Sequence, residues 1–178
     1  MLMRLIRTLL PCLLLLVCLS SRALAVGLYV EKLEDPDAIV CPVCHRPIIP
    51  GGIHENAENI ISTEFGGSLA EHGIPYTTEE GQTVYLNVLI YRFQERQGGN
   101  FSVVRPASVG FHVHLFEGGR LVDVFVFDET QQPLSDNVFR FFTFLKRGGR
   151  WITAGELARE GVHKAIDALS GNLKEEGQ

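Results

Sequence analysis

Sulfur is scarce in this sequence. Of its 178 residues only four are Cys and two are Met, and both methionines, Met1 and Met3, stand at the amino terminus. Two of the cysteines lie in the same leading segment. A chain that loses residues 1–25 therefore keeps one pair of thiols, Cys41 and Cys44, and no methionine. Such a chain cannot supply a methionine axial ligand to a haem.

Positive charge and long apolar runs are also scarce. The formal net charge is -5, with 16 basic and 21 acidic residues, so the chain has no electrostatic footprint for nucleic acid. After residue 25 no segment is apolar enough for long enough to cross a membrane. There is no phosphate-binding loop, no G-x-S-x-G elbow, no H-E-x-x-H helix and no G-x-G-x-x-G turn. We therefore expect a protein that is not an enzyme and has no cofactor, with haem c as the alternative.

The leading segment, residues 1–25, has the pattern of a secretory signal peptide. Two arginines precede an apolar run over residues 9–19, which is too short to span a bilayer, and an Ala-Leu-Ala cleavage motif ends at Ala25. Lipidation of Cys18 is an alternative, although a lipidated cysteine normally follows a smaller residue than Val17. We expect an exported protein, periplasmic or associated with the outer membrane, that touches the membrane only if Cys18 is lipidated.

Proline and glycine divide the rest of the chain. Residues 26–52 contain four prolines and a Gly-Gly pair, which predict an irregular arm with at most a short strand at 27–30. Residues 53–170 form the predicted domain, and residues 171–178 a disordered tail. Apolar residues at spacings of three and four predict a helix over residues 54–72 at the start of the domain.

Two more helices are predicted near the end of the chain. One runs over about residues 135–146 and has four phenylalanines in six positions, which cannot all face one core. They either bridge two core layers or form a surface for a partner, including a second copy of the chain: Phe139, Phe141, Phe142 and Phe144. A capping box at residues 153–156 begins the other helix, which is predicted to stop at Ser170-Gly171.

Residues rich in β-branched and aromatic side chains predict the strands. Residues 83–93 are apolar on both faces, which is typical of a central strand. A second strand begins near Phe101, is interrupted at Pro106 and resumes over residues 108–116. Residues 117–120, EGGR, predict a two-residue hairpin turn. We expect a single α/β or α+β domain whose helices pack on a mainly antiparallel sheet.

The hairpin also predicts a register. With the two glycines as its loop, Phe111 lies opposite Val126 on an apolar face and His114 lies opposite Asp123 on the other face. His112 shares that second face, where two imidazoles and the Asp123 carboxylate are candidate metal ligands. The favoured interpretation is a polar face with a cross-strand His114–Asp123 pair, which would raise the pKa of His114.

Part of the domain resembles a poorly characterised group of bacterial exported proteins and lipoproteins. The motifs that carry the resemblance are YRF at 91–93, VRPASV at 104–109, FDETQQPLS at 127–135 and FLKRGGRW at 144–151. More distantly, the segment is similar to CsgG-like, LpoB-like and TolB amino-terminal domains. The resemblance implies an accessory role in the periplasm or at the outer membrane, built on contacts with other envelope proteins. It supplies no catalytic residue.

The most specific motif is CPVCH, residues 41–45. This spacing attaches a c-type haem, with Cys41 and Cys44 bonded to the vinyl groups and His45 as an axial ligand of the iron. Prolines after the motif leave no helix to seat the ring. The second axial position would stay open or take one of four other histidines: His54, His72, His112 or His114.

Other interpretations of CPVCH are open. A local Cys41–Cys44 disulfide is favoured, because thiols in an oxidising compartment are expected to be bonded. Zinc needs four ligands, which Cys41, Cys44, His45 and His54 could supply only with an unusual spacing. A redox-active pair normally opens a helix, which the prolines disfavour.

Two functions from different classes follow from the sequence. The favoured one is a non-catalytic cell-envelope accessory protein that acts through protein–protein contacts. The alternative is a periplasmic monohaem electron-transfer protein, with haem c attached through Cys41 and Cys44.

Overall fold

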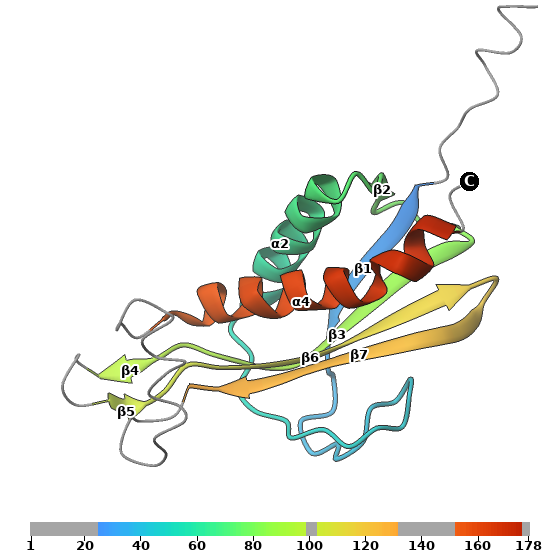
Figure 1. Ribbon diagram of the computed structural model, residues 1–178. Helices are drawn as coiled ribbons and strands as arrows, with labels where there is room; N and C mark the ends of the chain where they lie inside the picture. The colour runs from blue at the N-terminus through green and yellow to red at the C-terminus, as the bar shows by residue number, and fades with distance from the viewer. Residues whose placement is uncertain (1–24, 99–102, 132–151, 176–178) are drawn as a thin grey trace, which may run out of the picture.

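The computed structural model describes residues 25–98, 103–131 and 152–175 of the chain (Figure 1). A five-stranded sheet with the order β2-β1-β3-β6-β7 forms its centre. The strands of this sheet are β1 (Val26–Lys32), β2 (Tyr76–Thr77), β3 (Val84–Gln94), β6 (Ser108–Glu117) and β7 (Arg120–Thr130). Two short strands, β4 (Gln97–Gly98) and β5 (Val103–Arg105), pair separately, and the helices are α2 (Ala57–Glu71) and α4 (Ala154–Glu175).

The sheet is mixed, and its two longest pairings are antiparallel. β1 pairs in parallel with both β2 and β3, whereas β6 pairs antiparallel with β3 and β7. The parallel pairs arise because α2 connects β1 to the rest of the sheet as a crossover. The predicted single α/β domain is confirmed, and β3 is the central strand that the residues 83–93 predicted.

The two faces of the sheet are covered differently. Both helices lie on one face, and the arm that follows β1 lies against the other (Figure 1). Alternation along β3 supplies both layers, because successive side chains of a strand point to opposite faces. Leu86 and Val88 join the main core beneath the helices, whereas Leu89 and Tyr91 pack with residues of the arm.

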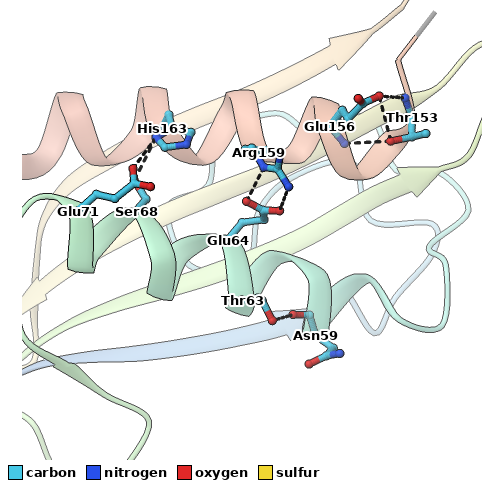
Figure 2. Close-up of polar contacts among 9 residues, drawn as sticks. All are labelled: Asn59, Thr63, Glu64, Ser68, Glu71, Thr153, Glu156, Arg159 and His163. Atoms are coloured by element: carbon cyan, nitrogen blue, oxygen red, sulfur yellow. Dashed lines mark hydrogen bonds and ion pairs between the residues drawn. The ribbon is translucent and has the colours of Figure 1, made fainter.

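The two helices begin close to their predicted residues. In α4 the Thr153 backbone N–H donates to Glu156 Oε2 at 2.9 Å, and the Glu156 N–H donates to Thr153 Oγ1 at 3.1 Å, which confirms the capping box (Figure 2). The two helices are joined on their exposed sides by ion pairs, including both guanidinium contacts of Arg159 to Glu64 at 2.9 Å (Figure 2).

The end of α4 differs from its prediction. The helix continues to Glu175 instead of stopping at Ser170-Gly171, so residues 171–175 of the predicted tail are helical. Leu173 is buried in the main core, which extends the apolar stripe beyond the glycine. A glycine inside a helix costs only about 1 kcal/mol, which this burial offsets.

The hairpin between β6 and β7 has the predicted turn but not the predicted register beyond it. Glu117 pairs with Arg120 as expected, and Gly118 and Gly119 have the positive φ angles that the turn requires. A bulge between Leu115 and Phe116 then shifts the pairing by one residue.

The bulge exchanges the faces of β7. His114 lies opposite Val124 rather than Asp123, and Phe111 lies opposite Phe127 rather than Val126. The shift turns Phe127 into the main core, where its ring lies 5.2 Å from that of Phe111. Burying an aromatic ring in place of valine favours this register.

The arm is irregular, as predicted, apart from β1, which is longer than the expected strand. It packs on the sheet through a small second core made by Cys41, Ile48, Leu89 and Tyr91. The predicted leader, Cys18, and the helix at 135–146 with its phenylalanines (Phe139, Phe141, Phe142 and Phe144) lie outside the described residues. Within the described ranges, no helix has the length and apolar character needed to traverse a bilayer.

Candidate metal centre

The CPVCH motif forms the tight end of a small hairpin within the arm. The Ile48 N–H donates to the Ile39 carbonyl at 3.0 Å, and the Cys41 N–H donates to the Arg46 carbonyl at 2.9 Å. The His45 N–H returns to the Cys41 carbonyl at 3.0 Å, with a positive φ of 57° at His45. The backbone therefore reverses directly after Cys44 and brings both thiols to the side of the hairpin that faces the sheet.

The turn also aims backbone amides at sulfur. Burial raises the pKa of the Cys41 thiol, and the backbone N–H groups of Cys44 and Val43 act on that thiol in the opposite direction. The thiol is thus held neutral by desolvation, while the donors needed to stabilise a thiolate are already in place. A cation beside the sulfur would favour the ionised form.

Strand β6 supplies two imidazoles to the same place. His112 and His114 are two residues apart, so both point to the face of the sheet on which the arm lies. Neither side chain is exposed to solvent. His114 Nε2 lies 3.3 Å from Cys41 Sγ, and His112 Nδ1 lies 3.4 Å from Cys44 Sγ.

These four side chains make a compact donor set. One ligand atom from each of Cys41, Cys44, His112 and His114 lies within 4.8 Å of all the others. In a tetrahedral zinc site, bond lengths of about 2.3 Å to sulfur and 2.0 Å to nitrogen separate neighbouring S and N ligands by about 3.5 Å. The two observed S–N distances are close to that value.

A second layer of contacts orients His114. Its Nδ1 lies 3.1 Å from Asn87 Oδ1 and 3.2 Å from the Asn87 carbonyl, so that nitrogen carries the proton and Nε2 presents its lone pair to Cys41. The Asn87 amide is itself oriented, because its Nδ2 donates to Glu31 Oε1 at 2.8 Å. Such hydrogen bonds are typical of metal-binding imidazoles.

His112 is oriented by packing. Its ring meets the Tyr91 ring edge to face, with centroids 5.1 Å apart. The Tyr91 hydroxyl donates to Asp128 Oδ2 at 3.0 Å, and Arg92 forms an ion pair with the same carboxylate. His112 Nε2 is buried without a hydrogen-bond partner among the described residues, which leaves Nδ1 as the nitrogen engaged with Cys44.

Electrostatics keep both imidazoles neutral. Burial lowers the pKa of His112 to about 4, with smaller contributions in the same direction from His114 and Arg46. Burial also lowers the pKa of His114, against the opposing effect of its hydrogen bond to Asn87. The neutral imidazole is the form that binds a metal.

The structure combines two pairs that the sequence treated separately. Cys41 and Cys44 lie together, as do His112 and His114, but no sequence pattern indicated that the arm folds onto β6. Asp123 is not part of the group: its carboxylate accepts hydrogen bonds from the Val124 N–H and from Asn172. The predicted His114–Asp123 pair is therefore wrong, and the pKa of His114 is lowered rather than raised.

The alternatives for CPVCH differ in how well they fit this geometry. Both cysteines are free thiols here rather than the favoured disulfide, because each sulfur faces an imidazole. The zinc ligands expected from the sequence beside the cysteines are also replaced: His45 is exposed, and His54 accepts a local hydrogen bond through Nδ1. A haem does not fit with Cys41 as it lies here, wholly buried against the sheet.

Comparisons with known proteins find likeness only among solved structures. No protein-family model and no curated protein matches the sequence. A single-substitution variant of the PelC dodecamer from Paraburkholderia phytofirmans gives a TM-score of 0.48 at 11% identity, covering 81% of this chain and 88% of that one. Protein XCC0632 of the DUF330 family, from Xanthomonas campestris, gives 0.46 at 12% identity, covering 85% and 90%.

A minor lipoprotein from Acinetobacter baumannii gives a TM-score of 0.33 at 9% identity and covers 80% of this chain and 93% of its own. The similarity to CsgG-like, LpoB-like and TolB amino-terminal domains stays a prediction. TM-scores below 0.5 support no inference about function.

Proposed function

We propose that this protein is a non-catalytic, exported cell-envelope protein that binds one Zn²⁺ ion through Cys41, Cys44, His112 and His114. The observation that carries the proposal is the convergence of these four ligand atoms to within 4.8 Å of one another. Two thiolates and two neutral imidazoles are a donor set that selects zinc among the common divalent metals.

The role of the ion is structural. Four protein ligands complete a tetrahedral shell and leave no open position for water or a substrate, in contrast to catalytic zinc sites. The burial of three of the four ligand residues fits such a closed site. Electron transfer is not supported, because Zn²⁺ has no redox chemistry and the haem does not fit.

The ion would fix the arm to the sheet. Without it, the segment from Leu33 to Pro50 is held by the small core around Ile48 and by a few hydrogen bonds, such as that from Arg92 Nη1 to the Ile49 carbonyl at 2.9 Å. The domain then presents a rigid arm on one face and two helices on the other. A rigid exposed arm suits a protein that works by contacts with envelope partners, which is the function expected from the sequence.

The test is a metal count on the full chain, purified with its thiols reduced. We expect one zinc per chain by elemental analysis, and a visible spectrum typical of tetrahedral thiolate coordination when Co²⁺ replaces zinc. His114→Ala should lose the metal, whereas His163→Ala, whose imidazole lies on the helix layer near Glu71, should keep it. Wild-type protein that neither retains zinc nor gives the Co²⁺ spectrum would refute the proposal, as would a Soret band from haem.

A further inference from the structure

We infer that the cysteine pair is also a site of thiol–disulfide exchange, in which Cys44 reacts with an external disulfide and Cys41 then resolves the mixed disulfide. This inference rests on the proposed zinc site, because it describes how that site is opened. The reagent is any accessible disulfide, whether of a small thiol or of a protein oxidant.

The two thiols differ in accessibility. Cys41 is wholly buried, in the small core with Ile48, Leu89 and Tyr91. Cys44 is half-buried, at the margin of that core. Cys44 is therefore the thiol that an external disulfide can approach more readily. A reachable thiol beside a shielded one is the usual arrangement of an attacking and a resolving cysteine.

The two sulfurs are also close enough to join. Both belong to the group of ligand atoms that lie within 4.8 Å of one another, and a disulfide requires a separation of about 2.0 Å. Only the turn between Cys41 and Cys44 has to adjust, because the histidines are fixed on β6. The side chain of Val43 is half-buried and that of Pro42 is exposed, so the adjustment disturbs little of the core.

The chemistry balances as two successive exchanges. The Cys44 thiolate attacks one sulfur of the external disulfide, so that the Cys44–sulfur bond forms, the external S–S bond breaks and one thiolate leaves. The Cys41 thiolate then attacks Cys44 Sγ, which forms the Cys41–Cys44 bond and releases the second external thiolate. Two electrons pass from the cysteine sulfurs to the external disulfide, and the two departing thiolates take up protons from water.

The product state has lost half of the metal ligands. A disulfide sulfur is a poor ligand for zinc, and the neutral imidazoles of His112 and His114 are too few to retain the ion. The disulfide expected from the sequence and the proposed zinc site then become two states of one site. Export into an oxidising compartment would place the protein where both states are accessible.

The experiment follows zinc and thiols together in the full chain. Reduced protein is loaded with one equivalent of Zn²⁺ and the metal is counted, which tests the proposed site first. Oxidised glutathione is then added, zinc release is followed with a metallochromic dye, and intact mass reports the loss of two hydrogens. We expect release and disulfide formation with the same time course, and recovery of zinc binding after reduction. Zinc that stays bound, or leaves while both thiols remain reduced, would overturn the inference without touching the proposed site.

Two variants test the order of attack. In metal-free protein, Cys41→Ser should accumulate a glutathione adduct on Cys44 at least about tenfold faster than Cys44→Ser accumulates one on Cys41, because the latter sulfur is shielded. Circular dichroism is used to check that both variants are folded. If either is not, alkylation of wild-type protein early in the reaction, followed by peptide sequencing, locates the first adduct. Equal rates in the variants, or a first adduct on Cys41, would overturn the assigned roles.

Discussion

Sγ of Cys41 lies 3.3 Å from Nε2 of His114, although the two residues are 73 positions apart in the sequence. One belongs to the arm and the other to β6, so this single contact ties an irregular segment to the most buried part of the sheet. A metal ion at this point would stabilise a long-range connection that the small second core supports only weakly.

Removing the metal should loosen the arm selectively. With zinc chelated, we expect the backbone amides of Cys41 and Ile48, which close the hairpin of the arm, to exchange hydrogen at least about tenfold faster, equivalent to about 1.4 kcal/mol. Amides in the middle of α2 should be unaffected and serve as the internal control. Hydrogen-exchange mass spectrometry makes the comparison. Equal hydrogen exchange in the arm with and without zinc would contradict the proposal that the ion fixes the arm to the sheet.

Asn87 should set the affinity of the site without binding the ion. Asn87→Leu removes the side-chain acceptor of His114 Nδ1 but keeps the backbone carbonyl at 3.2 Å, so we expect zinc affinity to fall by about tenfold, the lower end of the range for such contacts. The matched control is Asn172→Leu, which breaks a surface hydrogen bond to Asp123 and should leave affinity unchanged. Competition with a chromogenic chelator measures both. Similar affinities for the two variants would count against the orienting role of Asn87.

Much of the fold follows from local patterns in the sequence. The capping box at Thr153, the apolar stripes of the helices and the Gly-Gly turn are signals carried by neighbouring residues, and each appears in the structure near its predicted position. The bulge at Leu115 is not such a signal. It arises because Phe127 gains more by entering the core than Val126 would, and that competition depends on the helices packed above.

The candidate site was predictable only in halves. A C-x-x-C pair and an H-x-H pair each supply two metal ligands. Their presence in one chain is the signal that could have predicted a single four-ligand site. The zinc interpretation instead sought all its ligands near CPVCH, because the sequence does not show which strand an irregular arm covers. It therefore named His45 and His54 as the nitrogen ligands, whereas the structure places His112 and His114 beside the two cysteines.

The metal-free protein should lose stability as pH falls from about 6.5 toward 4. His112 has a pKa near 6.5 when unfolded and about 4 when folded, so in this window the unfolded chain binds more protons. The contribution of the neutral His112 imidazole to the free energy of unfolding is fully present above pH 6.5, and about 2 to 3 kcal/mol of it is lost by pH 4.5. Urea unfolding at pH 7 and pH 4.5 should show a smaller pH effect in His112→Leu than in wild type, and His163→Leu is the control. The same pH effect in wild type and His112→Leu would contradict the burial of a neutral imidazole.

A pair of helical glycines tests the register of β7. A Cβ at Gly161 would lie 2.6 Å from the ring of Phe127, whereas a Cβ at Gly67 would meet nothing within 4 Å. Gly67→Ala should therefore stabilise the protein by up to about 1 kcal/mol through helix propensity. Gly161→Ala should destabilise it by about 1 to 2 kcal/mol, because the buried ring cannot move aside without disturbing Phe111.

The double variant Gly161→Ala with Phe127→Leu makes this test specific to the bulge. If Phe127 fills the space against α4, shortening it should make room for the added methyl group, so the two substitutions should be less harmful together than their separate effects predict, by about 1 kcal/mol. In the unbulged register Val126, not Phe127, would face the helices, and the two substitutions would act independently. Denaturant unfolding of the wild type, both single variants and the double variant measures the coupling. A coupling energy indistinguishable from zero would favour the unbulged hairpin, in which His112 and His114 have different neighbours on β7.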